Sequence, residues 1–133
     1  MFRIRRLYAL ETEADRRAMD GVSGVFAHAF DYDPQGGARI ASQLAAAPDG
    51  KIEPMLLIAE DGRRRVLGFA YILYFPDVRA GYLEWIASDP ERSARGIGGA
   101  LYEAAREALA ARGARGLFLD VPPDDPAKTD ADD

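Results

Sequence analysis

The sequence of 133 residues contains no cysteine and a single histidine, His28. The absence of cysteine excludes disulfide bonds, thiolate metal sites and a cysteine acyl-enzyme intermediate. One histidine cannot form a histidine metal cluster, so we expect no metal site. His28 falls near the end of a predicted helix and has no partner motif nearby. A surface or capping role is therefore favoured over a catalytic one.

The sequence also lacks a long apolar segment. No uninterrupted apolar run approaches the roughly 18 residues that indicate a membrane-spanning helix, and the N-terminus has no apolar signal-peptide core. The net charge of −5 argues against a general nucleic-acid-binding protein. We therefore expect a cytoplasmic protein that binds neither membranes nor nucleic acid.

Apolar residues make up 48% of the sequence and aromatic residues 10%, which is enough for one packed domain. The charge is uneven, because residues 120–133 hold six aspartates, one lysine and three prolines. This composition is typical of a solvated tail. The sequence predicts one domain over residues 1–121, followed by a disordered acidic tail over residues 122–133.

Hydrophobic periodicity predicts an order of helices and strands along the domain. A first strand covers residues 2–8, with Phe2, Ile4 and Tyr8 facing inward. We expect helices over 13–30 and 38–47, strands over 55–59, 66–75 and 79–88, another helix, and a last strand over 115–121. The strand–helix–strand connection places the last strand parallel to its predecessor.

A glycine-rich segment, Ser-Ala-Arg-Gly-Ile-Gly-Gly over residues 93–99, joins the strand over 79–88 to the next helix. Glycine lets an anion approach the main chain. The first amides of a helix lack intrahelical partners, and the helix dipole favours negative charge there. The segment therefore predicts a phosphate site. The alternative is a tight connection that binds no ligand. Three glycines at the start of a helix argue against this alternative, because they lower helix propensity.

Two common phosphate motifs do not fit. A P-loop requires lysine and serine or threonine after the glycine, whereas Gly98 is followed by Gly99 and Ala100. The dinucleotide fingerprint requires a third glycine at position 101, which is leucine.

Residues 90–101, Pro-Glu-Arg-Ser-Ala-Arg-Gly-Ile-Gly-Gly-Ala-Leu, resemble the acyl-CoA loop of the GNAT acetyltransferases. Gly96 and Gly98 match the two signature glycines, Arg95 matches the frequent basic residue before them, and Ser93 stands where glutamine or arginine is usual. The resemblance covers about residues 2–121. It implies a mixed α+β fold with a mostly antiparallel sheet, helices on both faces, and a parallel pair formed by the fourth and fifth strands.

The resemblance also implies acetyl-CoA as the acyl donor, with no metal. The donor's diphosphate would be held by the segment that comprises Ser93, Ala94, Arg95, Gly96, Ile97, Gly98 and Gly99. In the family the two strands that flank the following helix part, and the pantetheine lies between them. The matching positions are Ile86, Ala87 and Ser88.

Glu84 is the predicted general base. It interrupts an apolar strand, where burial raises the pKa of a carboxyl group, and many GNAT members use a glutamate on this strand. A carboxylate that faces solvent at the strand edge is the alternative. Alternation places Trp85 on the opposite face.

The resemblance implies that the region between the two predicted N-terminal helices borders the acceptor site. The candidate substrate contacts there are Phe30, Tyr32 and Gln35. An ordinary helix pair with a polar loop is the alternative.

The family's usual continuation, with a pantetheine-binding asparagine, a helix bearing a general-acid tyrosine and a final hairpin, has no counterpart after residue 121. We expect either a piece of a longer acetyltransferase or a divergent short one. Its open fifth-strand edge could pair with a second copy. The predicted function is N-acetylation of a primary amine of a small molecule or peptide. The alternative is a non-catalytic acyl-CoA-binding or interaction module.

Overall fold

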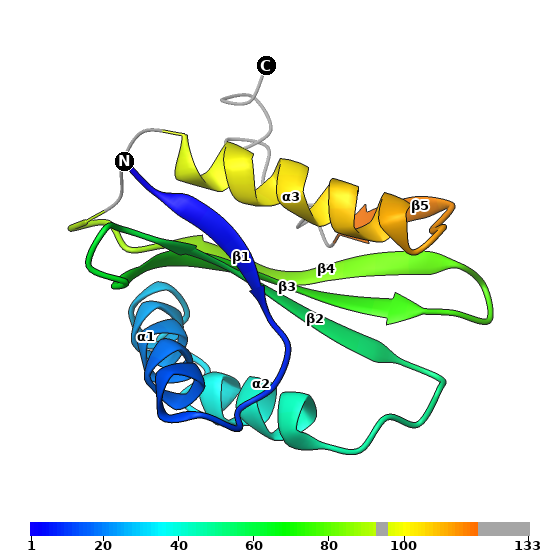
Figure 1. The fold of residues 1–133 in the computed structure, drawn as a ribbon, viewed down its shortest axis with the longest axis horizontal. Helices are drawn as coiled ribbons and strands as arrows, with labels where there is room; N and C mark the ends of the chain where they lie inside the picture. The colour runs from blue at the N-terminus through cyan, green and yellow to red at the C-terminus, as the bar shows by residue number, and fades with distance from the viewer. Residues whose placement is uncertain (93–95, 120–133) are drawn as a thin grey trace.

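The computed structural model describes residues 1–92 and 96–119. These residues form a five-stranded sheet with strand order β1-β2-β3-β4-β5, together with three helices (Figure 1). The strands are β1 (Arg3–Leu7), β2 (Glu53–Glu60), β3 (Val66–Phe75), β4 (Ala80–Ser88) and β5 (Gly116–Leu119). The helices are α1 (Glu13–Ala29), α2 (Gly36–Ala45) and α3 (Ile97–Ala111).

The helices cover both faces of the sheet, with α1 and α2 on one face and α3 on the other (Figure 1). Neighbouring strands from β1 to β4 are antiparallel, whereas β4 and β5 are parallel. The core between the sheet and α1 and α2 includes Val22, Phe26, Ile40, Phe69 and Tyr71. The core under α3 includes Met55, Ile72, Leu83, Leu101, Ala105 and Leu109. The predicted architecture is confirmed.

The pair α1 and α2 shows where close packing decides the structure. The second helix begins at Gly36, two residues before the predicted start at residue 38. A Cβ built at Gly36 would lie 2.0 Å from the ring of Phe26, and one at Gly37 would lie 2.6 Å from Ser23 Oγ. These two glycines therefore belong to the helix and allow it to approach α1.

The first strand corrects one prediction. Tyr8 is 71% exposed, because β1 ends at Leu7. Leu7 is only 1% exposed and packs into the core under α1. On the same strand Arg5 donates a hydrogen bond from Nε to Oε1 of the buried Glu60 over 2.8 Å, which ties β1 to the end of β2.

Within the described residues, no helix combines the length and the apolar character that a membrane crossing would require. The predicted tail over residues 122–133 lies outside those residues.

Candidate active site

The glycine-rich segment leads from β4 into α3. Gly96 is the N-cap of α3 and has a φ of 90°, in the left-handed region that favours glycine. A Cβ built at Gly96, Gly98 or Gly99 would meet no described heavy atom within 4 Å. Glycine lowers helix stability, and no neighbour requires it at positions 98 and 99. Packing within the described chain therefore does not explain these two glycines.

The centre of β4 contains a β-bulge. Tyr71 on β3 opposes Trp85, whereas the next residue, Ile72, opposes Leu83, so Glu84 is the extra residue. Leu83 packs into the core under α3, and Trp85 packs against the core under α1 and α2. Leu83 and Trp85 therefore face opposite sides although they are two residues apart, so the alternation breaks between them. Glu84 is electrostatically coupled to Tyr71 and to Arg39 of α2, which indicates that its carboxylate lies on the same side as Trp85. The prediction that alternation separates Glu84 from Trp85 is wrong, because the bulge interrupts the alternation.

The surroundings of Glu84 control its ionisation. The side chain is half-buried, and burial raises its pKa, while the guanidinium of Arg39 on α2 acts in the opposite direction. The net direction is upward, as the sequence predicted. Arg39 is fixed by a two-pronged pair with Asp33, with N–O distances between 2.8 and 3.1 Å. The pKa of Tyr71 is also raised, first by burial and then by the charge of Glu84.

The described part of β5 pairs with the first part of β4. The parallel ladder runs from the pair Ala80–Gly116 to the pair Leu83–Leu119. In the described part of the chain, no strand continues this ladder beside residues 84–88. The predicted pantetheine contacts Ile86, Ala87 and Ser88 pair with β3 and lie beyond the last described pair of the ladder with β5.

The structure leaves part of the predicted diphosphate site undescribed. Gly96, Ile97, Gly98 and Gly99 form the N-cap and first turn of α3, and Ile97 is buried against the sheet. Ser93, Ala94 and Arg95 lie outside the described residues.

The predicted acceptor contacts lie at the end of α1 and the start of α2. The ring of Phe30 lies 4.8 Å from that of Trp85, next to the bulge. Tyr32 is 74% exposed, and its ring lies 6.3 Å from that of Phe30. Gln35 is the exposed N-cap residue of α2 and makes no side-chain capping bond. The structure thus brings Phe30 and Tyr32 toward the bulge, and the substrate role of all three remains a prediction.

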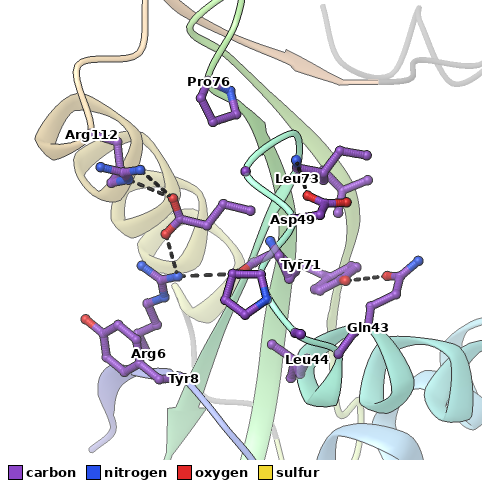
Figure 2. Close-up of a pocket in the computed structure, with 16 residues that line it drawn as sticks. Arg6, Tyr8, Gln43, Leu44, Asp49, Tyr71, Leu73, Pro76 and Arg112 are labelled. Atoms are coloured by element: carbon purple, nitrogen blue, oxygen red, sulfur yellow. Dashed lines mark hydrogen bonds and ion pairs between the residues drawn. The ribbon is translucent and has the colours of Figure 1, made fainter.

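A cavity of about 640 Å³ opens beside β3 and the loop that joins α2 to β2 (Figure 2). Tyr71 and Leu73 from β3 contribute to its wall, and the Tyr71 hydroxyl donates a hydrogen bond to Oε1 of Gln43. Leu44 lines it from α2. Tyr71 therefore links the two features, because it lines the cavity and its pKa also responds to the charge of Glu84.

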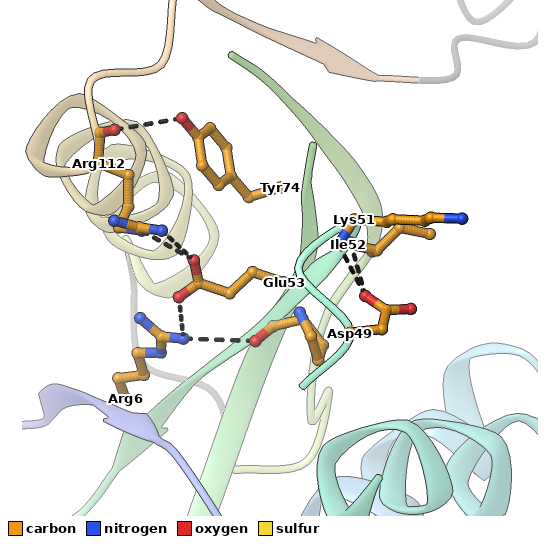
Figure 3. Close-up of polar contacts among 8 residues, drawn as sticks. Arg6, Asp49, Lys51, Ile52, Glu53, Tyr74 and Arg112 are labelled. Atoms are coloured by element: carbon orange, nitrogen blue, oxygen red, sulfur yellow. Dashed lines mark hydrogen bonds and ion pairs between the residues drawn. The ribbon is translucent and has the colours of Figure 1, made fainter. Parts of the chain in front are cut away.

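Glu53 organises the polar rim of this cavity (Figure 3). Its carboxylate accepts hydrogen bonds from Arg6 over 3.0 Å and from Arg112 Nε over 2.8 Å. Burial acts to raise the pKa of Glu53, but the two arginines outweigh it and the net direction is downward. The main-chain oxygen of Arg112 accepts from the Tyr74 hydroxyl over 3.2 Å. These contacts join β1, β2, β3 and the end of α3.

Comparison with protein families decides the relationship. The model described as the acetyltransferase (GNAT) family matches residues 29–129 of the chain. The chain belongs to the GNAT acetyltransferase family. A comparison with curated proteins finds no match.

Solved structures share the GNAT fold at low sequence identity. Tetrahymena GCN5 has a TM-score of 0.74 and 12% identity, covering 90% of this chain and 71% of its own. An aminoglycoside acetyltransferase, meta-AAC0020 from an uncultured soil metagenomic sample, has a TM-score of 0.70 and 16% identity. The match covers 98% of this chain and 85% of that protein. Ribosomal-protein-alanine N-acetyltransferase from Brucella melitensis biovar Abortus 2308 has a TM-score of 0.68 and 18% identity, covering 98% and 87%. The Tetrahymena GCN5 catalytic domain is also known in complex with coenzyme A.

Several residues of this GNAT domain were missed by sequence reasoning. Tyr71 reads as an ordinary core residue, although a buried tyrosine hydroxyl needs a partner and could have signalled a polar contact. Gln43 and Arg39 give no comparable signal, because solvent-facing positions of a helix commonly hold such residues. In the described residues, no group of three or more histidine, cysteine, aspartate or glutamate side chains is arranged to hold a metal ion.

Proposed function

We propose that this GNAT domain transfers the acetyl group of acetyl-CoA to a primary amine of a small molecule or peptide, by direct attack of the amine on the thioester. The observation that carries the proposal is the β4 bulge. Glu84 lies on the α1 and α2 side of the sheet, two residues before Ile86, and residues 86–88 lie beyond the last described pair of the β4–β5 ladder. In the proposal the strands part beside residues 86–88, so that the proton acceptor lies next to the pantetheine.

The described residues fit the donor. Acetyl-CoA supplies the activated thioester carbonyl. In the proposal, Gly96, Ile97, Gly98 and Gly99 present main-chain amides to the diphosphate, and the space where Cβ atoms would stand remains open. Ser93, Ala94 and Arg95 complete that site.

The end of β4, residues 86–88, has a different part in the proposal. Main-chain groups of Ile86, Ala87 and Ser88 pair with the pantetheine amides. One N–H in this stretch polarises the thioester carbonyl. A preorganised backbone donor at a developing oxyanion contributes about 3 kcal/mol in other acyl transfers.

Glu84 removes a proton from the acceptor ammonium, because a protonated amine is not a nucleophile. Burial raises the pKa of Glu84 and so makes it a better base than a solvated carboxylate, while Arg39 limits that rise. The acceptor's body lies in the cavity bordered by Tyr71 and Leu73. Phe30, Tyr32 and Gln35 bound the acceptor's approach from the other side.

We also propose that the outer edge of β5 pairs with a second copy of the chain. In the described residues β5 is the last strand of the sheet, and its Phe118 is 62% exposed. Sedimentation velocity tests this, since a Phe118→Asp variant should shift a dimer toward monomer. A wild-type protein that stays monomeric at high concentration would remove the dimer from the proposal.

Two measurements test the enzymatic proposal. Calorimetry measures CoA binding, and a thiol-release assay measures turnover with spermidine, an aminoglycoside and a peptide with a free N-terminal alanine. Glu84→Gln should lower the rate by about 10²-fold or more while leaving CoA affinity unchanged. Glu107→Gln, which removes an exposed carboxylate on α3, is the matched control and should be silent.

The outcomes separate the alternatives. CoA binding without turnover of any amine would favour the non-catalytic acyl-CoA-binding module. Turnover that is unaffected by Glu84→Gln would remove Glu84 from the mechanism.

A further inference from the structure

We infer that a second cleft, between α1 and the β2–β3 hairpin, binds a compact phosphate-bearing anion. The cleft measures about 530 Å³ and shares no lining residue with the cavity beside Tyr71. Its walls come from three parts of the chain: α1, the hairpin over residues 61–66, and residues 89–92 after β4. The last of these leads directly into the glycine-rich segment.

The lining of this cleft is rich in positive charge although the whole chain has a net charge of −5. The carboxylates in it are Asp89 and Glu91, and the basic residues are Arg17, His28, Arg63, Arg64, Arg65 and Arg92. Clustered guanidinium groups repel one another unless an anion or solvent compensates them.

Among the described residues, two of the five arginines have carboxylate partners. Arg17 pairs with Glu13 over 3.3 Å, and Arg65 pairs with Asp61 over 3.2 Å. The other three, Arg63, Arg64 and Arg92, form no ion pair with any residue in 1–92 or 96–119. Within the described part of the chain, no carboxylate competes with a ligand for these three guanidiniums.

The backbone holds two of these three arginines, Arg63 and Arg64, at a defined place. Oδ1 of Asp61 accepts hydrogen bonds from the main-chain amides of Arg63 over 2.8 Å and Arg65 over 2.9 Å. Arg64 has a φ of 63°, which is uncommon for a residue with a side chain. The turn thus presents consecutive arginines from a fixed hairpin.

The opposite wall is brought close by small residues. A Cβ at Gly21 would lie 2.7 Å from Val66 Cγ2, so α1 runs tightly against the start of β3. One turn further, a Cβ at Gly24 would meet nothing within 4 Å, which leaves room above the helix. Arg17 and His28 of α1 border the same cleft as the hairpin arginines.

Phosphate is the ligand chemistry that fits best. Guanidinium forks match phosphate oxygens in geometry and charge. Two sources share this chemistry: a free oligophosphate, and the 3′-phosphate of CoA. The second source rests on the proposed function, in which the diphosphate lies at residues 93–99, immediately after Arg92.

The test compares the full-length wild-type chain with the double variant Arg63→Gln/Arg64→Gln. Calorimetry measures the affinities for tripolyphosphate, CoA and 3′-dephospho-CoA. Arg79→Gln is the matched control, because Arg79 is also an exposed turn arginine with positive φ (51°) but lies in the β3–β4 turn. Circular dichroism and the melting temperature report whether each variant is folded.

We expect tripolyphosphate to bind the wild type and the control equally, and the double variant roughly tenfold more weakly. Two results together would identify the ligand as the 3′-phosphate of CoA. CoA would displace tripolyphosphate, and the wild type, but not the double variant, would bind CoA more tightly than 3′-dephospho-CoA. If tripolyphosphate and CoA bind together, the cleft is a separate oligophosphate site.

The inference is overturned if the double variant binds all three ligands as the wild type does, or if Arg79→Gln causes the same loss. Failure of the proposed glycine site is visible separately. In that case the wild type would not bind 3′-dephospho-CoA, which carries the diphosphate but lacks the 3′-phosphate.

Discussion

Replacing Gly98 with alanine should change stability and cofactor affinity in opposite directions. Gly98 is the second residue of α3, and a Cβ there would meet no described atom within 4 Å. Alanine at a helical position is more stable than glycine by about 0.5 kcal/mol or more, because it loses less backbone entropy on folding. For a chain of this size, that gain raises the melting temperature by about 2 °C.

The affinity for CoA should fall, because the added methyl group occupies space that the proposed function gives to the diphosphate. Displacing one charge-assisted amide–phosphate hydrogen bond costs about 1.5 kcal/mol, which corresponds to roughly tenfold weaker binding. Thermal unfolding without ligand measures the first effect, and calorimetry with CoA measures the second. The opposite signs exclude general unfolding as the cause of weaker binding.

Gly96→Ala is the matched control for this substitution. Its φ of 90° lies where an L-residue costs about 1–2 kcal/mol, so this variant should lose stability. A Gly98→Ala protein that is more stable and binds CoA as tightly as the wild type would refute the reasoning, since the glycine would then have no ligand to accommodate.

Three further predictions follow from the described contacts. Arg39→Gln removes the cation that lowers the pKa of Glu84, so the rising limb of the kcat/KM–pH profile should move to higher pH. A rising limb at the same pH as in the wild type would contradict this coupling. Glu53 has a lowered folded pKa, so its ion pairs stabilise the fold above the unfolded value of 4.5, and this contribution is lost as the pH falls through the folded value. Glu53→Gln should therefore cost about 1 kcal/mol in urea unfolding at pH 7 and less at pH 3.5, which lies below the unfolded value. Equal costs at both pH values would count against the ion pairs. Gly36→Ala should cost about 1–3 kcal/mol, because its Cβ overlaps an aromatic ring of α1, whereas Gly24→Ala should be neutral or stabilising in the same thermal assay.

Much of the fold was predictable because local signals agreed with the tertiary structure. Thr12 and Asp15 have the sequence pattern of a capping box, and both cap bonds are present at the start of α1. Gly113 follows the last residues of α3 and has a φ of 79°, as is common for a glycine after a helix end. The Asp61-Gly62 pair, a common hairpin signal, lies between β2 and β3. In each case the deciding interaction spans only a few residues.

Other features depend on partners that are distant in the sequence. The start of α2 is set by the ring of Phe26, which needs a glycine at position 36. The rim of the cavity is set by Glu53, whose two arginine partners come from β1 and from the end of α3. Neither contact leaves a periodic pattern in the sequence, because each joins elements whose spacing is fixed only by folding.

The bulge in β4 is the most consequential of these features. An alternating strand would place Glu84 and Trp85 on opposite faces, and the composition of residues 80–88 gives no sign of an extra residue. The irregularity arises in the pairing with β3, where Tyr71 opposes Trp85 and Ile72 opposes Leu83. Its consequence is electrostatic. Glu84 is coupled to Tyr71 and to Arg39 of α2, whereas Leu83, one residue earlier, packs into the core under α3. A register change that is set by the partner strand thus decides which charged and polar groups surround the candidate base.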